Sequence, residues 1–175
     1  MRYFFMAFFV VYLFVPQAAY AASKIVFDGK VYTRQAVDRT EIMTQAEYTQ
    51  GRETLENWTK LIAVRHFPNV TDPKEMVAQL VDVLYAQNPE AKHEMVILQD
   101  GNDVLMDFIT WPSNKTYLEF NVHRYRKVVG YKGLISYQFA YRFTHTTPKF
   151  LKQFMQNKEN WKKLMKDVTF PIDFE

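Results

Sequence analysis

The chain has 175 residues, with 22 Lys and Arg against 19 Asp and Glu, and a formal net charge of +3 at pH 7. A charge balance this close to neutral argues against nucleic acid or an anionic membrane as a partner. The sequence contains no cysteine, which excludes disulfides, thiolate metal sites, thiol nucleophiles and a lipoprotein anchor. The 11 Tyr and 15 Phe favour a folded globule.

The first 21 residues have the pattern of a secretory signal peptide. Arg2 provides a short positive region, residues 4–15 are an unbroken apolar run, and residues 19–21 read Ala-Tyr-Ala. The apolar run is too short to span a bilayer comfortably, and small residues follow it at the expected cleavage site. We therefore expect cleavage of residues 1–21 before Ala22, with an uncleaved N-terminal anchor as the alternative.

Cleavage leaves residues 22–175 as a single domain, in which we find no repeat or linker. An exported domain without cysteine favours a Gram-negative periplasm over an animal secretory pathway. Asn-x-Thr sequons at Asn57, Asn69 and Asn114 favour eukaryotic secretion instead. We expect a periplasmic or secreted protein that does not stay inserted in the membrane after cleavage.

The domain is expected to begin with a hairpin over residues 24–33, because Asp28-Gly29 suits a two-residue turn. Residues 34–56 are polar and weakly patterned, with at most one strand near residues 42–48. A strand is predicted over residues 58–67.

The first predicted helix follows this strand and has clear boundaries. Asp72 is the expected cap, Pro73 the first helical residue, and Glu75 has the spacing of a capping box. Asn88 before Pro89 ends the helix. Its apolar face consists of Met76, Val77, Leu80, Val81 and Leu84.

Four strands are then predicted, over residues 93–98, 103–110, 116–126 and 134–143. Their short connections imply antiparallel hairpins. In the last of them Ile135, Tyr137, Phe139, Tyr141 and Phe143 share one face, opposite Ser136, Gln138 and Arg142. The preceding strand should bury Leu118, Phe120 and Val122.

A second helix closes the chain, capped by Thr147 with Pro148 at its first position. An apolar stripe predicts that it covers the core: Phe150, Phe154, Trp161, Met165 and Val168. Lysines occupy the rest of its circumference: Lys149, Lys152, Lys162, Lys163 and Lys166. A basic amphipathic helix lying on a membrane is the alternative interpretation.

The element order predicts an α+β fold, an antiparallel sheet covered by helices. It resembles the PsbP-like superfamily, which includes DcrB-like proteins, across about residues 24–170. The resemblance rests on the strand from Glu56-Asn57-Trp58 to Arg65, the helix after Asp72-Pro73, and the meander followed by the helix at Pro148. It implies an α-β-α sandwich used for binding or assembly, without a shared catalytic centre.

The sequence shows no motif for catalysis, and we expect no cofactor and no metal site. The four histidines have none of the spacings typical of a metal site. No serine lies in a nucleophile elbow, and no glycines form a phosphate-binding loop. Asp107 lies among apolar neighbours, where a raised pKa with a catalytic role, exposure at a sheet edge, or a hydrogen-bonded partner would each explain it.

The densest basic and aromatic cluster is the candidate partner-binding site. It consists of His123, Arg124, Tyr125, Arg126, Lys127, Tyr131 and Lys132. Arginine and tyrosine are enriched at interfaces, so we expect either a docking patch for an acidic protein surface or an ordinary solvated strand end. We expect Arg124 and Arg126 to project together from one face, beside a turn that Gly130 and Gly133 keep open.

These observations predict a non-enzymatic, protein-binding accessory module, for example for envelope assembly or secretion. One alternative is a carrier of a small hydrophobic ligand between the sheet and the closing helix. Its pocket would be lined by Phe139, Tyr141, Phe154 and Trp161. A second alternative is a hydrolase-type enzyme. The sequence leaves the partner, the ligand and the oligomeric state open.

Overall fold

The computed structural model describes residues 23–98 and 101–175, so the predicted signal peptide and its cleavage point lie outside the described residues. The strands are β1 (Lys24–Phe27), β2 (Lys30–Arg39), β3 (Thr44–Gln50), β4 (Lys60–Phe67), β5 (His93–Leu98), β6 (Asp103–Thr110), β7 (Leu118–Arg126) and β8 (Leu134–Phe143). The helices are α1 (Pro73–Gln87) and α2 (Pro148–Asp167).

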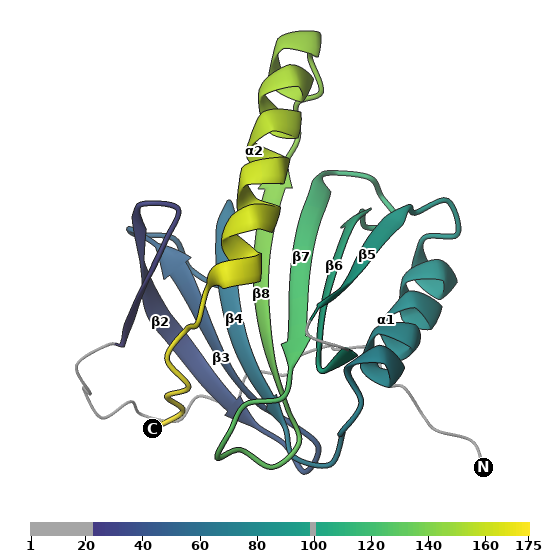
Figure 1. Cartoon of the computed structure of the whole chain (residues 1–175). Helices are drawn as coiled ribbons and strands as arrows, with labels where there is room; N and C mark the ends of the chain where they lie inside the picture. The colour runs from purple at the N-terminus through teal and green to yellow at the C-terminus, as the bar shows by residue number, and fades with distance from the viewer. Residues whose placement is uncertain (1–22, 99–100) are drawn as a thin grey trace.

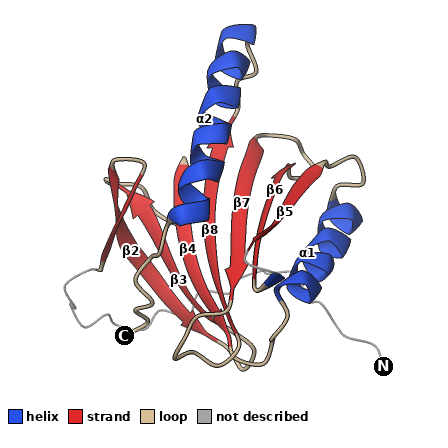
Figure 2. Ribbon diagram, in the orientation of Figure 1, coloured by secondary structure: helices blue, strands red, loops and turns tan. Residues whose placement is uncertain are grey.

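All eight strands form one antiparallel sheet in the order β1-β2-β3-β4-β8-β7-β6-β5. Successive side chains of a strand point to opposite faces. In β6, Leu105 packs in the core beneath α2, whereas Val104 and Met106 pack with α1. The two helices therefore lie on opposite faces of the sheet (Figure 2), and the predicted α+β fold is confirmed.

The first hairpin forms as predicted, with positive φ at both turn residues, 49° at Asp28 and 67° at Gly29. Within residues 34–56, the possible strand near residues 42–48 is present as β3, but the continuation of β2 beyond residue 33 was not predicted. β2 continues to Arg39 through a bulge between Arg34 and Ala36, and β3 runs beside it. The polar composition of residues 34–39 gave no sign that β2 continues through them.

The core beneath α2 is unusually aromatic. β7 and β8 contribute their inward faces to it as the alternation predicts, including Phe120, Val122, Tyr137 and Phe139, all with no exposed area. The tail after α2 completes this core, because Phe170 is buried and Phe174 packs against the cluster.

α1 covers a smaller core on the opposite face, in which its predicted apolar face packs against β6 and β7. Asp72 caps the helix by accepting a hydrogen bond from the backbone N–H of Lys74 at 2.8 Å. The reciprocal half of the predicted capping box is not seen, since Glu75 instead accepts from Gln79 one turn later.

α2 buries its predicted stripe, which confirms its role as a core-covering helix. Trp161 is 2% exposed, and its Nε1 donates to Asp28 Oδ2 in the first hairpin at 2.8 Å. Lys162 was wrongly predicted to lie on the solvated side. It is buried because it forms ion pairs with Asp107 at 2.9 Å and with Glu94.

We predict that Trp161→Ala lowers the free energy of unfolding by about 3–5 kcal/mol, because the indole ring is buried and the cavity would not collapse. Leu151→Ala in the same helix should change it by less than about 1 kcal/mol, since Leu151 is 41% exposed. Denaturant unfolding of both variants is the measurement, and equal losses would contradict the placement of the stripe.

Candidate binding groove

The basic cluster predicted to bind a partner is largely an interior feature, and the prediction of an open docking patch was wrong in this respect. His123, Arg124 and Tyr125 are 7%, 3% and 4% exposed. They lie in the middle of β7, with β6 on one side and β8 on the other. Their side chains alternate between the two covered faces of the sheet, so they do not form one surface.

Arg124 belongs to the core beneath α2. Its Nε lies 3.0 Å from Asp103 Oδ1 and its Nη2 lies 2.6 Å from Asp103 Oδ2, a two-pronged ion pair. Its Nη1 donates to the carbonyls of Met165 at 3.2 Å and Val168 at 2.9 Å. Arg124 therefore satisfies carbonyl groups that the end of α2 leaves without helical partners.

Of the remaining residues of the cluster, Arg126 lies near the Arg124–Asp103 ion pair, and the others lie in the loop after β7. Arg126 Nε lies 3.9 Å from Asp103, while Lys127, Tyr131 and Lys132 are exposed. The turn is not kept open at Gly133 as expected. A Cβ on Gly133 would lie 2.0 Å from the Phe67 carbonyl oxygen, so this glycine permits close packing of two backbones.

The four side chains predicted to line a ligand pocket fill the space between the sheet and α2 themselves. The Trp161 ring centroid lies 4.9 Å from that of Phe139, 5.3 Å from Tyr141 and 6.5 Å from Phe154. These are the distances of rings in direct contact. The space predicted to hold a ligand is therefore filled by side chains of the hydrophobic core.

An open groove of about 470 Å³ lies beside these rings, where β8 ends and α2 begins. The first turns of α2 project beyond the ends of the strands at this point (Figure 1). The groove is formed by the loop before β4, the start of β7, the end of β8 and the start of α2. Its lining residues are Glu56, Asn57, Trp58, Thr59, Tyr117, Tyr141, Arg142, Phe143, Thr144, His145 and Phe150.

Arg142 is the central polar group of the groove. Its guanidinium carbon lies 3.7 Å from the ring centroid of Trp58 and 4.7 Å from that of Tyr117. Cation–π contact of this kind favours a fixed position of the guanidinium plane. Its Nε also donates to Glu119 Oε2 at 2.8 Å, so three neighbours hold the side chain in place.

A chain of hydrogen bonds continues from Glu119 across the sheet, behind the groove. Asn121 Nδ2 donates to Glu119 Oε1 at 3.1 Å, and Gln138 Nε2 donates to Asn121 Oδ1 at 2.7 Å. Arg65 in turn donates to Gln138 and to Gln45. Networks of this kind rigidify the groups that they connect, and this one connects β3, β4, β7 and β8 to the groove.

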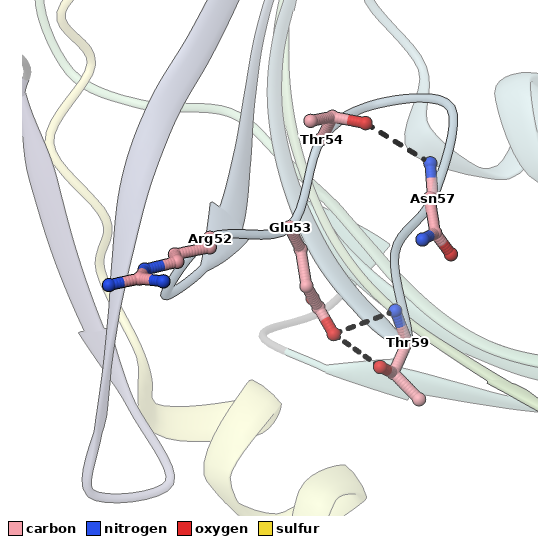
Figure 3. A pocket seen from close by; sticks show the side chains of 5 residues that line it. All are labelled: Arg52, Glu53, Thr54, Asn57 and Thr59. Atoms are coloured by element: carbon pink, nitrogen blue, oxygen red, sulfur yellow. Dashed lines mark hydrogen bonds between the residues drawn. The ribbon is translucent and has the colours of Figure 1, made fainter.

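The loop that forms one wall of the groove is braced from within. Thr59 donates to Glu53 Oε1 through its backbone N–H at 3.1 Å and through its hydroxyl, while Asn57 N–H donates to Thr54 Oγ1 at 3.3 Å (Figure 3). The hollow beside these residues has a volume of about 390 Å³ and is also lined by Arg52. Because these bonds close the loop on itself, we assign this hollow a structural role.

A cation, Lys60, also lies beside Tyr141, one of the rings of the groove. Lys60 Nζ is 5.7 Å from the Tyr141 ring centroid and 5.1 Å from that of Trp161. Burial lowers the pKa of Lys60. The first turn of α2 contains no acidic residue, so its positive dipole end is uncompensated at the rim of the groove.

The four histidines lie apart from one another, and each contacts different residues. His66 Nε2 is 2.7 Å from the Lys132 carbonyl, His93 lies beside Tyr85, and His123 stacks between two rings, while His145 lines the groove. Over residues 23–98 and 101–175, no group of three or more His, Asp or Glu is placed to hold a metal ion.

The position of Asp107 among apolar residues is explained by its ion-pair partners rather than by an active site. Its carboxylate is 3% exposed and lies 2.9 Å from both Lys158 Nζ and Lys162 Nζ of α2. Of the three explanations that the sequence left open, the structure favours the hydrogen-bonded partner, since Asp107 is buried and paired. The pair of lysines fixes the middle of α2 on β6.

Sequence reasoning missed most of the groove. Among the lining residues, Tyr141 alone was predicted to belong to a site, and that site was a different pocket. A usable signal was present, since Arg142 lies on the polar face of the last strand and Glu119 lies opposite it in the β7–β8 register. Trp58 and Tyr117 were predicted to lie inside strands over residues 58–67 and 116–126, but β4 begins at Lys60 and β7 at Leu118. Both residues therefore precede a strand, where alternation gives no information about burial.

Comparison with known proteins places the chain in a family. A protein-family model matches residues 19–170. The chain belongs to that family. Among solved structures, a mutant of protein Mog1 has a TM-score of 0.47 and 13% sequence identity over 85% of this chain and 93% of that one. No curated protein matches. The PsbP-like resemblance stays a prediction, because neither match bears that description.

We predict that stability falls as the pH is lowered from about 6.5, because burial, with the nearby charge of Arg65, lowers the pKa of His123 well below its usual value. Below this pH the unfolded chain binds a proton at His123 that the folded chain does not bind. The free energy of unfolding therefore falls by up to about 1.4 kcal/mol per pH unit.

Unfolding free energies of the wild type and His123→Gln between pH 7.5 and 5 are the measurement. The difference between the two curves isolates His123, since every carboxylate is present in both proteins. Parallel curves would contradict the burial of a neutral imidazole at this position.

Proposed function

We propose that this protein is an exported, non-enzymatic binding module that holds an extended segment of a partner protein in the aromatic groove. The observation that carries the proposal is the stacking of Arg142 between Trp58 and Tyr117. Tryptophan, tyrosine and arginine are the residues most often found at energetic centres of protein interfaces.

The groove is organised before any ligand arrives, which favours recognition over flexible contact. Arg142 is held by Glu119 and by the network behind it, so little side-chain entropy is lost on binding. A volume of about 470 Å³ is enough for a large apolar side chain and its backbone. The rings of Tyr141 and Phe150 supply an apolar floor for it.

The uncompensated end of α2 and His145 indicate the chemistry of the segment. Both favour an acidic group beside the apolar side chain. This expectation keeps the acidic partner predicted from the sequence and moves its site from the basic cluster to the groove. A carrier of a small hydrophobic ligand is less well supported, because its predicted pocket is filled by aromatic rings.

Export to a periplasm, or secretion, is supported by the character of residues 1–21 and by the lack of cysteine. No helix within residues 23–98 and 101–175 is long and apolar enough to cross a membrane. In this setting we propose an accessory role in envelope assembly or secretion, and the exported protein should begin at Ala22 on N-terminal sequencing.

Site-specific photo-crosslinking in cells tests the groove. A photoreactive amino acid at exposed Thr144 should give a crosslinked product with another protein, and the same group at Ile42 should not. Ile42 is 66% exposed and follows β2 at the opposite end of the sheet. A product of twice the chain mass would be a self-crosslink and is scored separately.

Tyr117→Ala should reduce the Thr144 product at least about fivefold, the effect of losing roughly 1 kcal/mol at an interface centre. Tyr131→Ala is the matched control, because Tyr131 is also partly exposed and lies outside the groove. Equal crosslinking from Thr144 and Ile42, or an equal response to both tyrosine variants, would contradict the proposal.

A further inference from the structure

The last strand in the sheet order, β5, has an unprotected edge. It pairs with β6 on one side, and within the described part of the chain no backbone hydrogen bond reaches its other side. Natural proteins protect such edges with lysine, proline, a bulge or very short strands. The other edge strand, β1, has four residues and begins with Lys24, whereas β5 has six residues, no lysine or proline, and an unbroken register.

Large apolar side chains are exposed along this edge. Met95 and Ile97 are 48% and 49% exposed, and they point to the same face of β5. Tyr85 of α1 is 41% exposed and lies beside the start of the strand, with its hydroxyl 3.2 Å from His93 Nδ1. These three side chains and the free backbone groups of β5 form what we call the β5 edge.

Charge does not oppose self-association at this edge. A two-fold axis brings the two copies of residues near the axis close together, so an unpaired charge at that point would repel its counterpart. The strand has one acidic residue and no basic one apart from His93. That residue, Glu94, is already paired with Lys158 and Lys162 of α2.

We propose that the β5 edge joins two copies of this chain, with the two β5 strands antiparallel and Val96 on the two-fold axis. This register sets Met95 of each copy opposite Ile97 of the other, so that four large apolar side chains meet on one face. Both this register and the one with Met95 on the axis set Glu94 opposite an apolar residue, Leu98 in the first and Val96 in the second. The register with Met95 on the axis also sets Ile97 opposite His93. It loses the apolar pairing that makes cross-strand contacts favourable.

The absence of cysteine from the chain makes the register directly testable. Residues on the axis of an antiparallel pair have Cα atoms about 4.5–5.5 Å apart, within the range that a disulfide bridges. Val96→Cys should therefore form a disulfide-linked dimer on mild oxidation at low micromolar concentration. Ile42→Cys, exposed and distant from β5, is the matched control and should remain monomeric.

Sedimentation equilibrium of the wild-type protein, into which no cysteine has been introduced, tests whether the dimer forms. The wild type should be dimeric, and Ile97→Lys should weaken the dimer by at least about tenfold, while Ile42→Lys should not. Circular dichroism melting checks that each variant folds. A wild type that stays monomeric at hundreds of micromolar would overturn the proposal, and so would a dimer equally sensitive to both lysine variants. The groove is not involved in either measurement, so this proposal and the proposed function can fail separately.

Discussion

The ion pair between Arg124 and Asp103 is the contact on which the rest of this structure depends. A charged pair beneath α2 is costly to desolvate and persists only when its hydrogen bonds are satisfied. Here the guanidinium binds both carboxylate oxygens and two carbonyls at the end of α2. One side chain thus joins β6, β7 and the helix that covers the core.

Two more contacts fix α2 along its length, and together they determine the position of the groove. Asp107 holds the middle of the helix through two lysines, and Asp28 of the first hairpin holds Trp161. Because the C-terminal half is anchored, the N-terminal turns extend past the sheet and form one wall of the groove. On the other face, the hydrogen-bond chain that ends at Arg142 sets the position of the opposite wall.

Local signals in the sequence predicted the elements well, because caps, turns and alternation act over a few residues. Asp72 and Thr147 cap their helices, and Asp28-Gly29 forms its turn. The candidate sites were harder, since they depend on partners distant in sequence. The alternation that buried Phe120 and Val122 also directs Arg124 inward, but a buried arginine is plausible only once Asp103 is known to lie on the adjacent strand. The register of the β6–β7 hairpin sets Asp103 directly opposite Arg126, and Leu105 opposite Arg124, so the position of the turn alone would not have identified Arg124 as the main partner of Asp103.

Native-state hydrogen exchange of Arg124→Met tests the role of this residue most directly. Arg126→Met is the matched control, because Arg126 lies near the same carboxylate and donates to neither helix carbonyl. We expect Arg124→Met to accelerate selectively the exchange of the amides in the last two turns of α2, while the amides of β2 and β3 keep their protection. Uniform loss of protection, or the same pattern in both variants, would contradict it.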